Sequence, residues 1–148
     1  DYRVFQLNFN MLDTRAIESG LFDIASRMNL GIIARTPLCF GFLSGDFKED
    51  QTFAENDHRS RWSNKQVERW ARGAREVLSL AEEGGEPGSV LAALRYCLSF
   101  SQISTAIPGM MSRDQVAHNV LASNRGALPS NVLYAIREQN KLFESFGP

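Results

Sequence analysis

Two short strand-like segments that flank one helical segment constrain this chain more than any other feature. Residues 4–9 are rich in β-branched and aromatic side chains and break at residues 10–13, which predicts a short buried strand. Apolar residues then recur at helical spacing over residues 15–28, with Thr14 as a candidate N-cap, and a second apolar run follows at residues 31–34. A strand, a helix and a strand joined by short links form a unit with parallel strands. We therefore expect an α/β fold.

The rest of the chain continues this alternation. Ser89 is a candidate cap for one helix and Ser112 for another, with Gln115 placed to complete a capping box, and Pro108-Gly109 stops a strand. Long loops in compact domains are usually functional, and one is expected between the second strand and the next helix. The predicted elements are the loop at residues 36–63, helices at 67–81, 89–100, from 112 onward and 130–146, and a third strand at 103–107.

Composition excludes several classes of protein. The 148 residues have the size of one ordinary domain, and 16 basic against 17 acidic residues give a net charge of -1, which excludes a globally basic nucleic-acid binder but leaves a local basic site open. No apolar run approaches the roughly 20 residues that cross a bilayer, and no secretory signal is visible. Cys39 and Cys97 lack metal-ligand spacing, as do His58 and His118, so we expect buried reduced thiols, no metal site and a cytoplasmic protein.

Three parallel strands cannot close a sheet on themselves. The first and third strands would each keep an unpaired edge, which proteins avoid. The chain also begins at Asp1, and strand-like alternation is already under way at Val4. We therefore expect a piece of a longer polypeptide, or a sheet completed by another chain.

Four segments carry a family resemblance: residues 4–12, 31–45, 93–98 and 107–119. In their order, spacing and residue sequence, these segments resemble the carboxy-terminal half of the aldo-keto reductase family. The family fold is a (β/α)8 barrel, which needs about 250 residues. The resemblance implies that residues 1–148 carry roughly the last three parallel strands of an incomplete TIM-type barrel, with the helices behind them.

The resemblance also implies an activity. In the family, a hydride passes from a nicotinamide cofactor, usually NADPH, to an aldehyde or ketone. The catalytic tetrad of Asp, Tyr, Lys and His lies in the amino-terminal half, so no residue of this chain can be matched to it. The chain would supply the cofactor-binding half, with NADP as the expected cofactor and NAD as an alternative, and would be inactive alone.

One group of candidate cofactor residues follows the first two strands. The Gln6 amide can donate to and accept from a nicotinamide carboxamide, or it can satisfy a backbone neighbour. Arg35 stands where many relatives place a stacking aromatic, and it could stack, meet a phosphate or remain solvated. Small residues of the following loop would allow close backbone approach near the pyrophosphate. The remaining matched positions of this group are Thr36, Pro37, Leu38, Gly41 and Ser44.

The second group surrounds the turn after the third strand, where free backbone N–H groups and the helix dipole favour an anion. In the family this turn holds the 2′-phosphate and adenine. Gly109, Gln115 and Asn119 match family positions, and the last two lie on one helix face. Many relatives carry Arg or Lys where this chain has Met111 or Gln115, which leaves Arg113 as the turn's cation.

Alternatives remain open for the loop and for the whole chain. Arg59 or Arg61 could clamp a phosphate, or both could belong to a solvated loop tip. The expected partners are a small carbonyl substrate and either the amino-terminal half of the barrel or a second copy of the chain, with no nucleic acid and no membrane. Some family members, such as potassium-channel β subunits, act mainly through partner binding, so a regulatory module that senses cofactor is one alternative, and a self-associating half-barrel is another.

Overall fold

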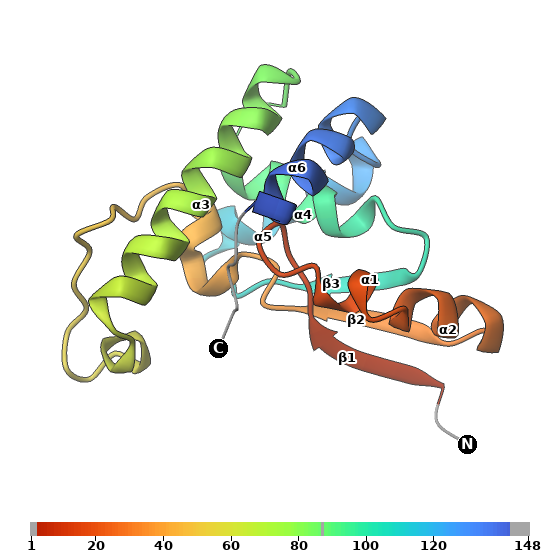
Figure 1. Ribbon diagram of the computed structural model, residues 1–148, viewed down its shortest axis with the longest axis horizontal. Coiled ribbons are helices and arrows are strands. Elements are labelled where there is room, and N and C mark those ends of the chain that lie inside the picture. The colour runs from red at the N-terminus through yellow and green to blue at the C-terminus, as the bar shows by residue number, and fades with distance from the viewer. Residues whose placement is uncertain (1–2, 87, 143–148) are drawn as a thin grey trace.

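A three-stranded parallel sheet organises the molecule (Figure 1), which is a computed structural model that describes residues 3–86 and 88–142. Strands β1 (Val4–Asn8), β2 (Gly31–Arg35) and β3 (Ile103–Ile107) lie in the order β1-β2-β3. Both strand pairs are parallel, which confirms the predicted α/β class.

The two faces of the sheet differ in burial. Ile32 and Ala34 of β2 are fully buried, and Ile103 of β3 lies on the same covered face. On the opposite face, Arg35 is exposed, and the apolar Ile107 at the end of β3 is 44% exposed. Helices α1 and α2 lie above the sheet in Figure 1, and α4 packs against β3, so the buried side chains of β2 join the core that these helices help to form.

The prediction that residues 4–9 form a buried strand is wrong for β1. Val4 is 51% exposed and Phe5 is 39% exposed, and burial rises only toward Phe9. β1 is an edge strand of the described sheet, so its outer side carries no neighbouring strand in the described part of the chain.

The predicted helix over residues 15–28 is divided into two. α1 (Arg15–Glu18) ends before Gly20, whose φ of 73° is left-handed, and α2 (Leu21–Met28) starts anew. Thr14 is the N-cap residue of α1, as predicted, but its hydroxyl donates to the Glu18 carboxylate at 2.7 Å and accepts no backbone N–H. The glycine's left-handed backbone interrupts a pattern of apolar spacing that otherwise continues through it.

The long loop contains two short 3-10 turns, η1 (Cys39–Ser44) and η2 (His58–Arg61), before α3 (Asn64–Glu83). Ser63 caps α3 by accepting the Gln66 N–H, so that helix starts three residues before its apolar pattern. Gly88, rather than the predicted Ser89, is the N-cap residue of α4 (Ser89–Leu98), because the left-handed Gly88 already turns the chain into the helix.

The last two helices agree better with the sequence. Ser112 caps α5 (Arg113–Arg125) by accepting the Gln115 N–H at 3.2 Å, as predicted. The Gln115 side chain accepts the N–H of Met111 at 2.6 Å, one residue earlier than in a capping box. α6 is described over Ser130–Leu142, with Val132 and Ile136 buried, and its predicted extension to residue 146 lies outside the described residues.

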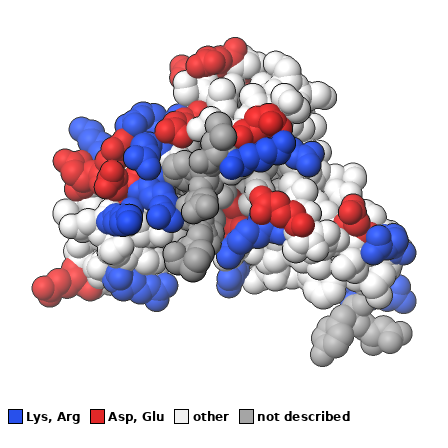
Figure 2. Space-filling model, viewed as in Figure 1, with Lys and Arg blue, Asp and Glu red and all other residues white. Residues whose placement is uncertain are grey.

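The surface carries side chains of both charges, and the interior is apolar. Figure 2 shows basic and acidic side chains intermingled on the face it presents. Cys39 and Cys97 are buried free thiols, as predicted. Within residues 3–86 and 88–142, none of the helices has both the length and the apolar character to span a bilayer.

Candidate functional site

The carboxyl ends of the three strands meet at one edge of the sheet because the strands are parallel. Arg35 Nε donates to Asn8 Oδ1 at 3.0 Å, and Thr36 Oγ1 lies 3.2 Å from the same oxygen. Arg35 also pairs in register with Ile107, the last residue of β3. The tips of β1 and β2 therefore form a polar edge, made by Asn8, Arg35 and Thr36, and the apolar Ile107 at the tip of β3 lies beside it.

Thr36 at the end of β2 has a strained backbone. Its φ is 53°, a left-handed value that costs a β-branched residue about 1–2 kcal/mol. Asn10 holds this conformation, because its Nδ2 donates to the Thr36 carbonyl oxygen at 2.9 Å while its Oδ1 accepts the N–H groups of Leu12 and Asp13. Asn10 is 1% exposed, so the strained peptide is fixed by a buried side chain. Strain of this kind is typical of functional sites.

Gln6 lies on the same open face as Arg35. It pairs in register with Ile33, two residues before Asn8, and its side chain is exposed. No neighbouring helix covers it on that face of the described sheet, because the core lies on the other side. Gln6 and Arg35 therefore lie on one face of two adjacent strands, and Thr36 follows Arg35 directly.

The η1 turn is packed against the chain's own loop. Pro37 is fully buried, Leu38 is half-buried, and Gly41 has a left-handed φ of 100°. A Cβ at Gly41 would lie 3.0 Å from the Phe47 ring and 3.4 Å from an Arg59 nitrogen. The space that the missing side chain of Gly41 leaves open is thus occupied in this structure by the Phe47 ring from the long loop.

Ser44 has local hydrogen-bond partners. Its hydroxyl donates to the Gly41 carbonyl at 2.8 Å and accepts the Asp46 N–H at 3.3 Å. Both contacts stabilise the turn into the long loop. A pyrophosphate role for this hydroxyl would require it to exchange the bond to Gly41.

Arg59 is the central contact of the long loop. Its guanidinium binds both oxygens of Asp57, with a shortest distance of 2.6 Å, and donates to the Phe40 carbonyl at 3.3 Å. It also lies over the rings of Phe47 and Phe53, at 5.1 Å and 4.6 Å from their centroids. Hydrogen bonds from Arg59 lower the pKa of Asp57 to about 2. Arg59 is therefore committed to holding the loop, whereas Arg61 is exposed.

An aromatic cluster lies beneath this loop. Trp62 contacts Phe40 and Trp70, with both pairs of ring centroids 4.8 Å apart, and Phe40 stacks on Trp70. His58 is exposed beside this cluster. Among the residues that the structure describes, no three histidine, cysteine or carboxylate side chains gather at a spacing that could hold a metal ion.

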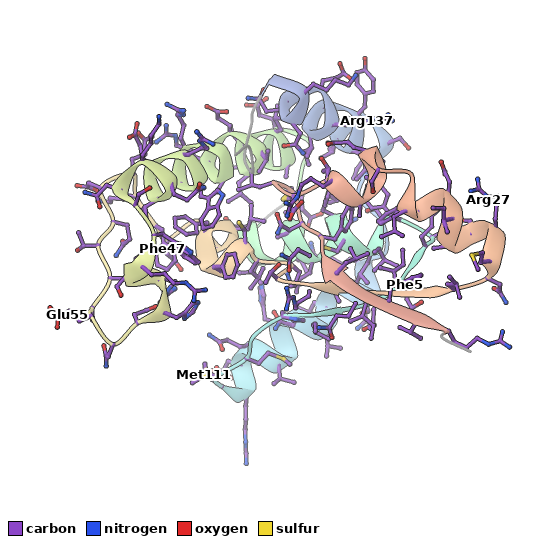
Figure 3. The ribbon with its side chains drawn as sticks, turned by 60° about the horizontal axis from the view of Figure 1, so that its bottom comes forward. Phe5, Arg27, Phe47, Glu55, Met111 and Arg137 are labelled. Atoms are coloured by element: carbon purple, nitrogen blue, oxygen red, sulfur yellow. The ribbon has the colours of Figure 1, made fainter. Side chains whose placement is uncertain are left out.

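The turn between β3 and α5 is open and carries little positive charge. Gly109 and Arg113 are exposed, Met111 is 94% exposed, and Asp114 adds a negative charge to the first turn. Met111 lies beside the start of α5 at the edge of the molecule, away from α6 (Figure 3). Asn119 is half-buried on α5, one turn beyond Gln115. The helix N-terminus can accept an anion, but its own side chains offer one cation.

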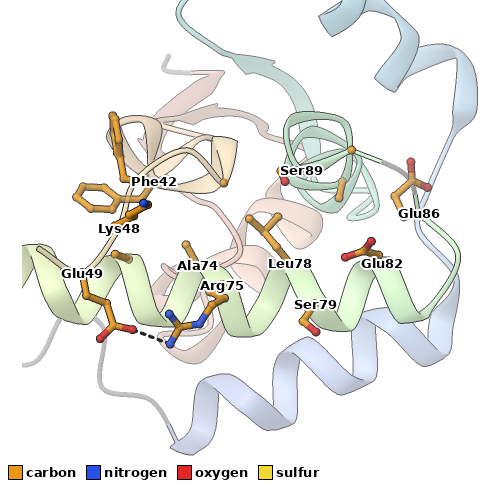
Figure 4. Close-up of a pocket in the computed structure, with 15 residues that line it drawn as sticks. Phe42, Lys48, Glu49, Ala74, Arg75, Leu78, Ser79, Glu82, Glu86 and Ser89 are labelled. Atoms are coloured by element: carbon orange, nitrogen blue, oxygen red, sulfur yellow. Dashed lines mark ion pairs between the residues drawn. The ribbon is translucent and has the colours of Figure 1, made fainter. Parts of the chain in front are cut away.

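A separate pocket of about 860 Å³ lies between η1, α3 and α4 (Figure 4). Leu78 and Ser89 face each other across it, and Glu49 pairs with Arg75 at 2.6 Å on its rim. None of the twelve predicted cofactor residues appears among the described residues that line it. It is distinct from the polar edge at the strand tips.

Sequence reasoning missed Asn8 and Asn10, which hold the strand tips together. The available signal is the pattern Asn8-Phe9-Asn10 directly after a strand, because asparagine readily bonds to nearby backbone and tip groups. Neither the partner residues nor the strain at Thr36 can be deduced from that pattern, since the bonded residues lie 26 to 28 positions apart.

Comparisons with known proteins place these observations in context. The model of the Aldo/keto reductase family matches residues 1–141. The chain is 29% identical over 153 residues to human "Aldo-keto reductase family 7 member A3", covering 91% of this chain and 46% of that protein. It is 25% identical over 124 residues to a "Probable voltage-gated potassium channel subunit beta" of Oryza sativa subsp. japonica, covering 80% of this chain and 38% of that protein.

The fold also matches solved structures. The glycerol dehydrogenase AKR11B4 from Gluconobacter oxydans superposes with a TM-score of 0.80 at 22% identity, covering 98% of this chain and 44% of that one. At this identity the likeness concerns the fold alone. The chain spans less than half the length of each of these three proteins.

Proposed function

We propose that this chain, which belongs to the aldo/keto reductase family, supplies the cofactor-binding part of an oxidoreductase that reduces aldehydes or ketones with NADP(H) in the cytoplasm. The observation that carries the proposal is the polar edge at the strand tips. There, Arg35 is bonded to Asn8 and is paired in register with Ile107, the last residue of β3, from which residues 108–112 lead to α5.

The proposal assigns residues 1–148 to the carboxy-terminal half of a (β/α)8 barrel. Three parallel strands with an uncovered face support this assignment, as does the share of each relative that the chain covers. The catalytic tetrad would then lie in the amino-terminal half, which would also be the partner that covers the open face. A second copy of this chain is the alternative partner.

The residues at the edge fit a nicotinamide cofactor. When bound, the cofactor would supply the hydride. The exposed Gln6 amide would hold the carboxamide, and the exposed Arg35 guanidinium would lie beside the nicotinamide or a phosphate. The N-terminus of α5, with Gln115 and Asn119 one turn apart, would receive the adenosine end.

The test compares two polypeptides: the one that the gene encodes and the 148-residue chain. We expect the first to oxidise NADPH with an aldehyde and the second to be inactive. Turnover by the 148-residue chain would show that the reactive groups lie within it and would refute the assignment of the tetrad. If the encoded polypeptide binds neither NADPH nor NADH, the cofactor role is wrong.

A second candidate function is favoured by the similarity to the rice potassium channel subunit beta. In this alternative the chain belongs to a module that binds cofactor and regulates a partner protein without turnover. Cofactor binding by the encoded polypeptide, with no aldehyde reduction and with a stable partner complex, would support it. A third reading, in which half-barrels pair with each other, requires a dimer, and a monomer in light scattering would exclude it.

A further inference from the structure

We infer that Asn8 is a positioning residue that orients Arg35 toward the bound cofactor, an inference that rests on the proposed function. Asn8 is the last residue of β1, and Arg35 is the last residue of β2. The register of the sheet pairs them directly. Asn8 Oδ1 accepts the Arg35 Nε–H at 3.0 Å, so one bond fixes the base of the guanidinium fork.

This geometry leaves the terminal guanidinium nitrogens of Arg35 available to bind the cofactor. The bond to Asn8 uses Nε alone, and the two terminal nitrogens carry the remaining donors. Within residues 3–86 and 88–142, no acidic side chain forms an ion pair with Arg35, in contrast with Arg59 and Arg95. The guanidinium therefore keeps its charge uncompensated by the described chain at the edge where a phosphate or a nicotinamide ring would lie.

The same oxygen also ties the strained residue to the site. Thr36 Oγ1 lies 3.2 Å from Asn8 Oδ1 and 2.7 Å from the Arg35 carbonyl, so its single hydroxyl proton is shared between two acceptors. Asn8 thereby connects the side chain of Arg35 to the backbone turn that follows it. An arginine that is free in solution has many rotamers, and fixing one of them in advance lowers the cost of binding.

A merely structural role for Asn8 makes a different prediction. If Asn8 only supported the sheet, its removal would lower thermal stability and would affect binding equally with or without Arg35. If Asn8 acts through Arg35, its removal matters only when Arg35 is present. A double-mutant cycle separates the two cases.

The experiment measures NADPH and NADH dissociation constants, cofactor KM, kcat and Tm for Asn8→Ala, Arg35→Ala and the double variant of the polypeptide that the gene encodes. The exposed Asn131→Ala is the matched control. We expect Asn8→Ala to weaken cofactor binding by about three- to tenfold, the range expected when binding must order one side chain that was fixed before, with kcat within about twofold and Tm equal to that of the control. In the Arg35→Ala background, Asn8→Ala should have no further effect.

The outcomes are distinguishable. Unchanged affinity in Asn8→Ala beside weakened affinity in Arg35→Ala would overturn the positioning role while leaving the cofactor site intact. An equal loss from Asn8→Ala in both backgrounds would also overturn it. Absence of any effect of Arg35→Ala, or absence of cofactor binding in the unaltered protein, would instead count against the proposed function itself.

Discussion

Removing the guanidinium of Arg59 should release the loop that precedes α3. This side chain joins three parts of the loop: it binds the Asp57 carboxylate, donates to the Phe40 carbonyl at 3.3 Å and lies over the rings of Phe47 and Phe53. In Arg59→Ala all of these contacts are lost together. The rings of Phe47 and Phe53 also pack against the hydrophobic core, so the loop and the core meet at these two side chains.

The magnitude follows from the contacts. Each cation–π contact at a partly exposed site contributes about 0.5–1 kcal/mol, and the long charge-assisted bond to the Phe40 carbonyl contributes about 1 kcal/mol, near the lower limit for such bonds. The sum of about 2–3 kcal/mol corresponds to about a 30- to 150-fold increase in the population with an open loop.

Hydrogen exchange and tryptophan fluorescence report this opening. Trp62 and Trp70 are the two tryptophans of the chain and both lie in the aromatic cluster beneath the loop, so their emission should shift to longer wavelength. Arg61→Ala removes an exposed arginine of the same loop and is the matched control. Exchange in the loop that is equal in Arg59→Ala and Arg61→Ala would refute this account of how the loop is held.

The same contact predicts behaviour in acid. The pKa of Asp57 falls from its ordinary 3.8 to about 2 because Arg59 donates hydrogen bonds to the ionised form. A lowered pKa in the folded state means that this contribution is complete above about pH 4 and is lost as the pH falls toward 2. Protection of the loop of the unaltered protein from hydrogen exchange should therefore fall as the pH decreases from about 4 to about 2, and the loop of Arg59→Ala should show a smaller dependence on pH over this range.

Three further predictions concern the cofactor site, the thiols and the core. Met111→Arg adds a cation at a 94% exposed position of the β3–α5 turn, so NADPH should bind about tenfold more tightly while NADH affinity changes little, and an equal change for both would contradict the placement of the 2′ end. Burial raises the pKa of both thiols, that of Cys97 to about 12 and that of Cys39 further, so a thiol reagent at pH 8 should react with neither until denaturant is added. Ile136→Ala, at a fully buried position of α6, should lower the free energy of unfolding by about 2–5 kcal/mol in denaturant titrations, whereas Tyr134→Ala, 66% exposed, should change it little.

The order of strands and helices could be predicted because it depends on local patterns. The apolar run at residues 103–107 and the cap at Ser112 both depend on neighbours within a few positions, and the structure confirms both. The break at Gly20 was missed, because apolar spacing continues through it and only the left-handed backbone reveals the end of α1. Local periodicity specifies where a helix can form and leaves open whether it is continuous.

The burial of β1 could not be predicted from its composition. Val4 and Phe5 have side chains typical of a buried strand, yet they are exposed at the edge of the described sheet. A run of β-branched and aromatic residues indicates that the segment is suited to a strand with a buried face. Whether that environment is present depends on partners that a single segment does not encode.

The shape of the candidate site depends on contacts between distant segments. The left-handed backbone of Thr36 is unfavourable by itself and is held by Asn10, which lies 26 residues earlier. Asn8, 27 residues before Arg35, reaches that side chain only when β1 and β2 are paired in register. Forming the sheet and shaping the site are therefore one event. A chain that lacked β1 would lose both the bond that holds the strained turn after β2 and the bond that orients the arginine, so this part of the site belongs to the strand pair rather than to the loop that follows it.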